Sequence, residues 1–213
     1  MKLESFLIGA LILSVVGLAV SYSARADEIQ TNDYTFACVQ YDCHLHLSNR
    51  IEFEENYKLL FIGLSKLTPR HQLTVHLAGQ GGVGSTMSRL INIIEASGAQ
   101  TIALVEGDVA SAHAFIAVAM DKVYSAPENI FLFHIPAYRA SVEELCADDK
   151  GKTDRGQDKE IKCRQYYSAT LLQAVKLTVR LTKNYLTAEQ MREMLKGYDI
   201  ILTARELGFT PYK

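Results

Sequence analysis

A serine and a histidine near the middle of the chain could together perform nucleophilic catalysis. Ser111 follows an apolar run, Thr101–Val105, that ends in Glu106-Gly107-Asp108, and it precedes an alanine-rich segment. This pattern predicts a strand, a tight glycine turn and a helix start, which would expose the serine hydroxyl beside free backbone N–H groups. His134 directly follows a second apolar run over 130–133. Either residue alone is typical of an ordinary loop or packing position, but the two together are two members of a nucleophilic triad.

A glycine-rich segment upstream could supply groups that stabilise an oxyanion. Gln72–Leu77 is typical of a short strand, and it runs into Ala78–Gly84 and then into apolar residues with helical spacing. Glycines between a strand and a helix leave backbone N–H groups uncovered, and one such donor typically stabilises a transition state by about 3 kcal/mol. A phosphate-binding loop is the alternative, but no Gly-Lys-Ser/Thr sequence ends the segment.

Four segments between about Arg50 and Phe209 carry these patterns in a fixed order. They are Leu73–Gly82, Gly107–Ser111, Phe133–Pro136 and Tyr198–Phe209. In this order they resemble the glycine, nucleophile, histidine and aspartate motifs of ClpP, the proteolytic subunit of the Clp protease. The resemblance implies an α/β fold of the ClpP/crotonase type, a ββα spiral with a parallel sheet.

The resemblance also implies roles for particular residues. Ser111 would be the nucleophile, His134 the general base and then acid, and Asp199 the group that orients the imidazole. An oxyanion hole would be formed by backbone N–H groups of two loops, those of Gly82 (or Gly81) and of Ala112. The chain would then be a serine endopeptidase that acts on peptides or unfolded polypeptides, without a cofactor or a metal ion.

Two departures from the family pattern affect this assignment. Gln80 stands where the family usually has proline, and Ala112-His113-Ala114 replaces the usual Met-Gly-Ala. His113 is therefore a rival base by proximity. We rank it below His134, because a residue two positions along a helix points away from Ser111.

Three other functions are alternatives. The segment 110–127 also resembles SppA and NfeD-type proteases, which use a serine–lysine dyad, and Lys150 or Lys152 could supply its base. Lysines among the acidic residues of 148–158 are, however, typical of a solvated surface. A crotonase-type acyl-CoA enzyme shares the fold, but an export signal argues against CoA thioesters as substrates. A non-catalytic assembly subunit is the third alternative, since a fold does not establish an activity.

The first 26 residues form a separate segment. Lys2 precedes an apolar run over 6–20, and Ala24-Arg25-Ala26 follows it. These are the parts of a secretory signal peptide with cleavage before Asp27, although a membrane anchor over 6–22 is the alternative. We therefore expect an exported protein of the periplasm or cell envelope, with 1–26 as the signal and 27–213 as one peptidase domain.

The four cysteines follow this segment and lie as two close pairs. An even number in an exported chain indicates disulfides, and the simplest of the three possible connectivities is Cys38–Cys43 with Cys146–Cys163. Strand alternation puts His44 and His46 on one face near the first pair, which could suit a metal ion. A second ligand pair with the spacing of a zinc site is missing, so we expect a disulfide there and no metal.

Strands and helices alternate along the rest of the chain, which favours a parallel sheet with right-handed crossovers. The pattern predicts strands over 49–53, 72–77, 101–105, 123–124 and 130–133, and helices over 54–67, 85–97, 111–120 and 163–181. Capping boxes at 187–190 and 203–206 predict two further helix starts, and Gly208 stands where the second would stop.

The charge balance and the resemblance together indicate the partners. With 22 Lys and Arg against 24 Asp and Glu, no basic patch suggests nucleic acid. The resemblance implies a homo-oligomeric ring, for which the aliphatic helix over 162–181 is a candidate handle between stacked rings. The charged segment 148–159 would have to be solvated or face a chamber. An ATP-driven unfoldase partner is not expected outside the cytoplasm.

Overall fold

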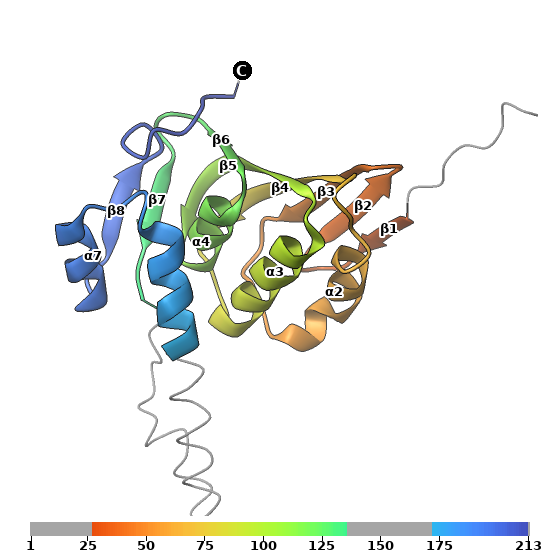
Figure 1. Cartoon of the computed structure of the whole chain (residues 1–213), viewed down its shortest axis with the longest axis horizontal. Coiled ribbons are helices and arrows are strands. Elements are labelled where there is room, and N and C mark those ends of the chain that lie inside the picture. The colour runs from red at the N-terminus through yellow and green to blue at the C-terminus, as the bar shows by residue number, and fades with distance from the viewer. Residues whose placement is uncertain (1–26, 136–171, 213) are drawn as a thin grey trace, which may run out of the picture.

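The computed structural model describes residues 27–135 and 172–212 (Figure 1). Within these residues one eight-stranded mixed sheet has the order β1-β2-β3-β4-β5-β7-β8, with β6 paired to β5 off this path. The strands are β1 (Asp27–Gln30), β2 (Thr35–Val39), β3 (Asp42–Leu47), β4 (Gln72–Gly79), β5 (Gln100–Ala110), β6 (Lys122–Ser125), β7 (Ile130–Phe133) and β8 (Ile200–Thr203). The predicted parallel sheet is confirmed for β3 to β7, whereas β1–β2–β3 and β7–β8 pair antiparallel.

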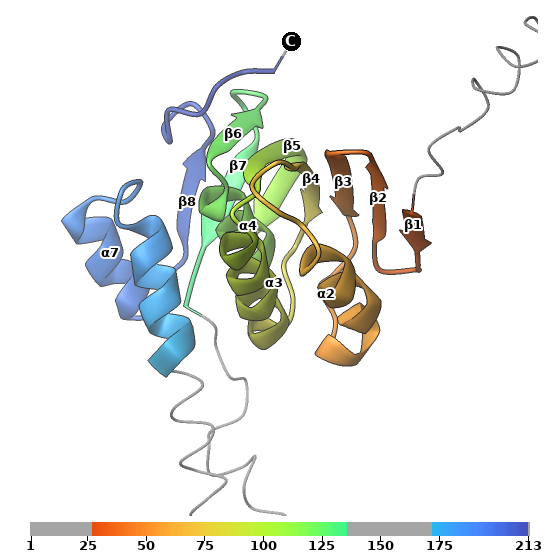
Figure 2. The ribbon, with the colours of Figure 1, turned by 45° about the vertical axis from the view of Figure 1, so that its right-hand side comes forward.

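Helices cover one face of the central strands (Figure 2). The 3-10 turn η1 (Glu54–Tyr57) leads into α2 (Lys58–Leu64), and α3 (Gly84–Ser97) and α4 (Ala112–Ala119) follow. Alternate residues of the strands, such as Leu45, Val75 and Val105, are fully buried in one core with the apolar sides of these helices. A helix over 172–182 and α7 (Ala188–Leu195) lie beside β7 and β8.

Strand β5 is longer than we predicted. The sequence suggested a strand ending at Val105 and a tight turn at Glu106–Asp108, but β5 runs through Gly107 to Ala110. The loop before β7 supports this extension, since Asn129 Nδ2 donates to the carbonyl of Val105 at 3.0 Å and Asp108 accepts from the N–H of Ile130 at 2.8 Å. The first part of β5 pairs with β6 and its end pairs with β7, so the turn falls at Ser111.

Two other predicted elements differ from the structure. The predicted strand over 49–53 is reduced to one bridge between Ile51 and Gly82, and the helix expected over 54–67 begins as η1 and ends at Leu64. The capping box at Thr187 is confirmed. At Thr203 both capping-box hydrogen bonds with Glu206 form, but the residues after it make turns rather than a helix.

Several predictions fall outside the described residues. These are the signal segment 1–26, the Cys146–Cys163 pair, Lys150 and Lys152, and the first part of the helix over 163–181. In the part of the chain that is described, no helix combines the length and the apolar content needed to cross a bilayer.

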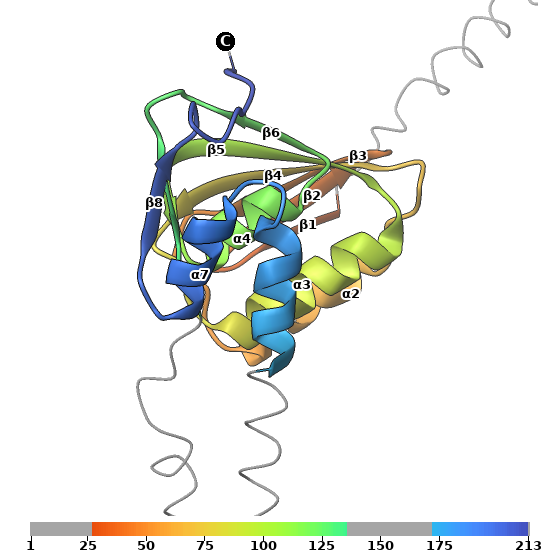
Figure 3. The ribbon, with the colours of Figure 1, turned by 60° about the vertical axis from the view of Figure 1, so that its left-hand side comes forward.

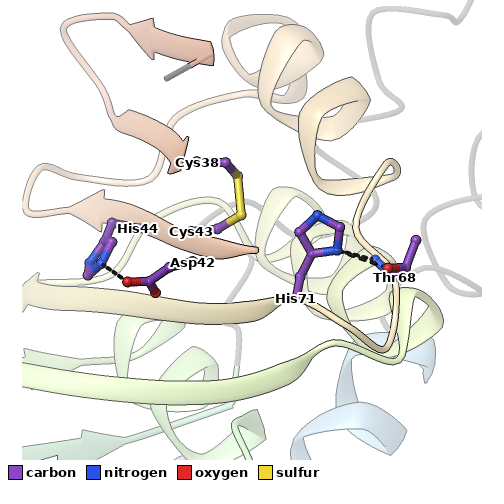
Figure 4. Close-up of a disulfide and its surroundings, with 6 residues drawn as sticks. All are labelled: Cys38, Asp42, Cys43, His44, Thr68 and His71. Atoms are coloured by element: carbon purple, nitrogen blue, oxygen red, sulfur yellow. Dashed lines mark hydrogen bonds and ion pairs between the residues drawn. A yellow bond between two sulfur atoms is a disulfide. The ribbon is translucent and has the colours of Figure 1, made fainter. Parts of the chain in front are cut away.

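The Cys38–Cys43 disulfide is confirmed (Figure 4). The two cysteines are direct partners in the antiparallel register of β2 and β3, with Cα atoms 4.1 Å apart. The bond therefore closes a short hairpin whose strand β3 continues into the core through the fully buried Cys43.

We expect the double replacement Cys38→Ala/Cys43→Ala to lower the free energy of unfolding by about 2 kcal/mol, because the bond closes a loop of only about six residues. Urea unfolding of the oxidised mature protein measures the change. The variant Cys146→Ala/Cys163→Ala serves as a comparison for the second predicted pair. An unchanged midpoint in the first variant would mean that the hairpin is held by strand pairing alone.

Candidate active site

Ser111, His134 and Asp199 lie at the ends of three neighbouring strands, along the same edge of the sheet where these strands begin or end. Ser111 follows the last residue of β5, His134 follows the last residue of β7, and Asp199 precedes the first residue of β8. β7 and β8 pair antiparallel with Phe133 opposite Ile200, so the register continued by one residue sets His134 against Asp199. The atoms agree with this register, since His134 Nδ1 lies 3.4 Å from Asp199 Oδ1. Figure 3 shows how β8 runs across the direction of β4 and β5 to reach this edge.

Ser111 occupies a sharp turn between strand and helix. Its φ of 52° and ψ of −120° are unusual for a residue with a side chain. Two hydrogen bonds hold this conformation: the N–H of Ser111 donates to the carbonyl of Leu132 at 2.8 Å, and its own carbonyl accepts from the N–H of Phe115 at 3.0 Å. A strained turn of this kind exposes a nucleophilic hydroxyl above the end of a sheet.

The Ser111 and His134 side chains line the same open groove. The structure holds no hydrogen bond between the Ser111 hydroxyl and the His134 ring, in the part of the chain that it describes. In a triad without substrate, the hydrogen bond from the nucleophile to the base is often long or poorly aligned. Because Asp199 faces Nδ1 of His134, it is Nε2 that is left for the serine hydroxyl.

The glycine-rich loop packs directly against the Ser111 turn. Gly81 has a φ of 95°, and a Cβ atom at this position would lie 2.6 Å from the Ser111 Cβ and 3.0 Å from the Ala112 nitrogen. Gly82 has a φ of 148°, and a Cβ there would overlap the backbone of Ile51. Two hydrogen bonds with Ile51 fix the loop in place: the Ile51 N–H donates to the Gly81 carbonyl, and the Val83 N–H donates to the Ile51 carbonyl. Only glycine fits at either position.

The backbone N–H groups of Gly81, Gly82 and Ala112 differ in their hydrogen-bond partners. The Gly81 N–H donates to Nδ1 of His113 at 2.9 Å. No acceptor for the N–H groups of Gly82 and Ala112 is found among the described residues. Of the two glycines that the sequence suggested, Gly82 is thus the one with a free donor.

His113 has a role that the sequence analysis did not suggest. Its side chain is fully buried, and it does not line the groove. Burial lowers the pKa of His113 to about 4, so the ring is neutral. Since Nδ1 accepts a hydrogen bond from Gly81, the ring proton is on Nε2, which lies near the Leu47 and Asn49 carbonyls without a well-aligned hydrogen bond. His113 holds the glycine loop from behind, and no local sequence pattern signals such a contact.

The opposite wall of the groove comes from the helix over 172–182. Gln173, Lys176 and Arg180 line the groove there, and Arg180 pairs with Glu95 of α3 at 2.9 Å. Met87 and Phe115 are buried apolar residues of the lining. The lining of the groove therefore combines buried apolar residues with charged ones.

We expect the stability of the protein to fall as the pH drops from about 6.5 to about 4, in part because of His113. The pKa of His113 is about 4 when folded and 6.5 in its ordinary state, so the unfolded chain takes up the proton first. The contribution of neutral His113 is complete above 6.5 and is lost below 4, and it amounts to at most about 3 kcal/mol. His113→Asn retains an acceptor for the Gly81 N–H and should flatten the pH dependence.

Urea unfolding at several pH values measures this slope for the wild type and His113→Asn. The control is Ser88→Ala, which changes a residue of the same groove without removing a titratable group and should leave the slope as it is. Equal slopes in the wild type and His113→Asn would contradict the assignment of a neutral, buried His113.

Comparisons with known proteins agree with this architecture. A solved structure of a mutant of ClpP1 from Listeria monocytogenes matches with a TM-score of 0.51 and 18% sequence identity, over 80% of this chain and 91% of that chain. No protein-family model and no curated protein sequence matches the chain. The chain therefore has a ClpP-like α/β fold with a partly parallel sheet.

Proposed function

We propose that this chain is an exported serine endopeptidase that hydrolyses peptides or unfolded polypeptides. The proposal rests chiefly on one observation, the pairing of β5, β7 and β8. In this register Ser111, His134 and Asp199 follow or precede neighbouring strands at the same end of the sheet, and Ser111 and His134 line one groove with Gly82 and Ala112. This arrangement supports the proposal. The ClpP-like fold supports it further.

In the proposed mechanism, Ser111 Oγ attacks the carbonyl carbon of the scissile peptide bond and gives its proton to Nε2 of His134. Asp199 keeps the proton of His134 on Nδ1 and stabilises the imidazolium that forms. The N–H groups of Gly82 and Ala112 donate to the oxyanion of the tetrahedral intermediate. His134 then protonates the leaving amine, and a water molecule attacks the acyl-enzyme in the same way.

The groove favours an extended polypeptide as the substrate. It is half open to solvent, and residues of both the glycine loop and the helix over 172–182 line it. Phe53, which is 65% exposed, offers an apolar contact to a side chain of a substrate. Folded proteins would not present such a strand, so unfolded chains and peptides are the proposed substrates.

We expect Ser111→Ala and His134→Ala each to abolish hydrolysis of a fluorogenic peptide or of unfolded casein. Asp199→Asn should cost less than either, but still on the order of 10²- to 10⁴-fold in kcat. A fluorophosphonate should label the wild type and not Ser111→Ala. Ser88→Ala is the matched control, because Ser88 lines the same groove while its hydroxyl donates to the Gly84 carbonyl.

Loss of activity in Lys152→Ala with full activity in His134→Ala would replace the triad by a serine–lysine dyad. If the wild type is neither labelled nor active on any peptide, a non-catalytic assembly subunit is the better assignment. Turnover of an acyl-CoA thioester instead of peptides would favour the crotonase-type alternative.

We also propose that residues 1–26 direct export and are removed. The Ala24-Arg25-Ala26 sequence and the Cys38–Cys43 disulfide support this, since disulfides persist in oxidising compartments. Mass spectrometry of protein recovered from the cell envelope should give a chain that begins at Asp27 and has no free thiol. A full-length chain would instead assign 6–22 as a membrane anchor.

The ClpP-like fold further leads us to propose that the mature chain associates into a homo-oligomeric ring. The helix over 172–182 is a candidate contact, because Leu172 is 54% exposed there. Light scattering on the mature protein measures the mass. A strict monomer at micromolar concentration would contradict the ring, without bearing on the triad.

A further inference from the structure

We propose a second site in this protein, which binds a divalent transition-metal ion such as zinc on the sheet face opposite α2, α3 and α4. Its ligands are His44 and His46 of β3 and His76 of β4. None of the three lines the Ser111 groove. From the sequence we expected no metal ion beside His44 and His46, because further ligands were missing. The proposal departs from that expectation because His76, on a different strand, supplies a further ligand.

Strand pairing gathers the three histidines. β3 and β4 are parallel neighbours, and their register sets His46 directly opposite His76. His44 is two residues before His46 and so lies on the same face. The residues between and beside them, Leu45 and Val75 among them, are fully buried toward the helices, so the histidines face away from the core.

The rings are in direct contact with one another. His44 Nδ1 lies 3.0 Å from His76 Nε2. The His46 ring stacks on the His76 ring, with centroids 3.9 Å apart. His44 and His76 each have a carboxylate near the ring nitrogen that does not face the other histidine. His76 Nδ1 lies 2.8 Å from Glu106 Oε1, and His44 Nε2 lies 3.5 Å from Asp42 Oδ2. Figure 4 shows His44 turned toward Asp42.

The contact between the His44 and His76 rings is a place where a metal ion can replace a proton. An ionised carboxylate only accepts hydrogen bonds, so Glu106 favours a proton on Nδ1 of His76 and leaves the lone pair on its Nε2. That lone pair faces Nδ1 of His44 at 3.0 Å, and either a proton on His44 or a metal ion can lie between the two nitrogens. Zinc–nitrogen bonds of about 2.0–2.1 Å at a tetrahedral angle separate two nitrogens by about 3.4 Å, so a small rotation of the rings suffices.

The remaining features suit zinc. Carboxylates at the far nitrogens of ligand histidines orient the rings and raise their basicity. In the structure no three His, Cys, Asp or Glu side chains of the described residues converge on one point. His46, which is exposed, completes the set by turning its ring away from the stack, and water fills the fourth position. Cys38 and Cys43 are joined in the disulfide, so they are not ligands.

Calorimetric titration of the oxidised, chelator-treated mature protein with Zn²⁺ tests the proposal, and it requires no peptidase activity. We expect one equivalent to bind. His44→Ala and His76→Ala should each weaken binding at least about 100-fold, and Glu106→Gln should weaken it about 10- to 100-fold. With Co²⁺ in place of zinc, the wild type should show the visible absorption of a tetrahedral site.

Two control variants separate this site from other histidines. His71→Ala removes a surface histidine that lies near the same disulfide and interacts with Thr68, and it should bind Zn²⁺ like the wild type (Figure 4). His134→Ala disables the proposed triad and should also bind normally. Circular dichroism and urea unfolding verify that each variant is folded.

Absence of one-equivalent binding by the wild type would overturn the proposal and leave a proton shared by His44 and His76. Binding that persists in the folded double variant His44→Ala/His76→Ala would overturn it as well. Binding that is lost in His134→Ala but kept in His76→Ala would move the metal to the Ser111 groove.

Discussion

The close approach of Gly81 to the Ser111 turn is the contact on which the rest of the site depends. Ser111 has a positive φ, and its Cβ faces a position where any side chain on Gly81 would collide with it. The two candidate oxyanion donors, Gly82 and Ala112, each follow one partner of this contact. Their spacing is therefore set by a glycine pressed against a strained serine. His113 and Ile51 hold the loop from behind and from the side.

The sheet connects this contact to the other catalytic candidates. The long strand β5 pairs with β6 in the core through its first part and with β7 at its end, just before Ser111. β7 places buried Phe131 and Phe133 in the core before it reaches His134. Core packing of these side chains therefore positions the site, since a shift of β7 by one residue would turn the phenylalanines out of the core.

The sequence predicted features that depend on local patterns. The glycine loop and the helices over 85–97 and 111–120 are visible as apolar periodicity interrupted by glycine, and the structure places α3 and α4 within a residue of these bounds. The extension of β5 through Gly107 was missed because it relies on Asp108 and Asn129 contacting a later loop. The position of Asp199 relative to His134 came from a family resemblance, since its physical basis is the antiparallel register of two strands far apart in sequence.

His76 illustrates the same limit on the other face of the sheet. On its own strand it is a lone histidine between apolar residues, and only the register of β3 with β4 makes it the neighbour of His44 and His46.

The position of His76 also links the two sites physically. The regular pairing of β4 with β5 is interrupted between Leu77 and Gly79, one residue after His76 and immediately before the glycines of the loop. A metal ion held by His44 and His76, with Glu106 of β5 as a partner of His76, would link three strands one residue before the last regular pair of β4. Such a link restricts sliding between the strands. The glycine-rich loop would then be free to change its conformation only from Gly79 onward. Binding on the outer face would then act on the groove only through the rigidity of β4, without a change in its shape.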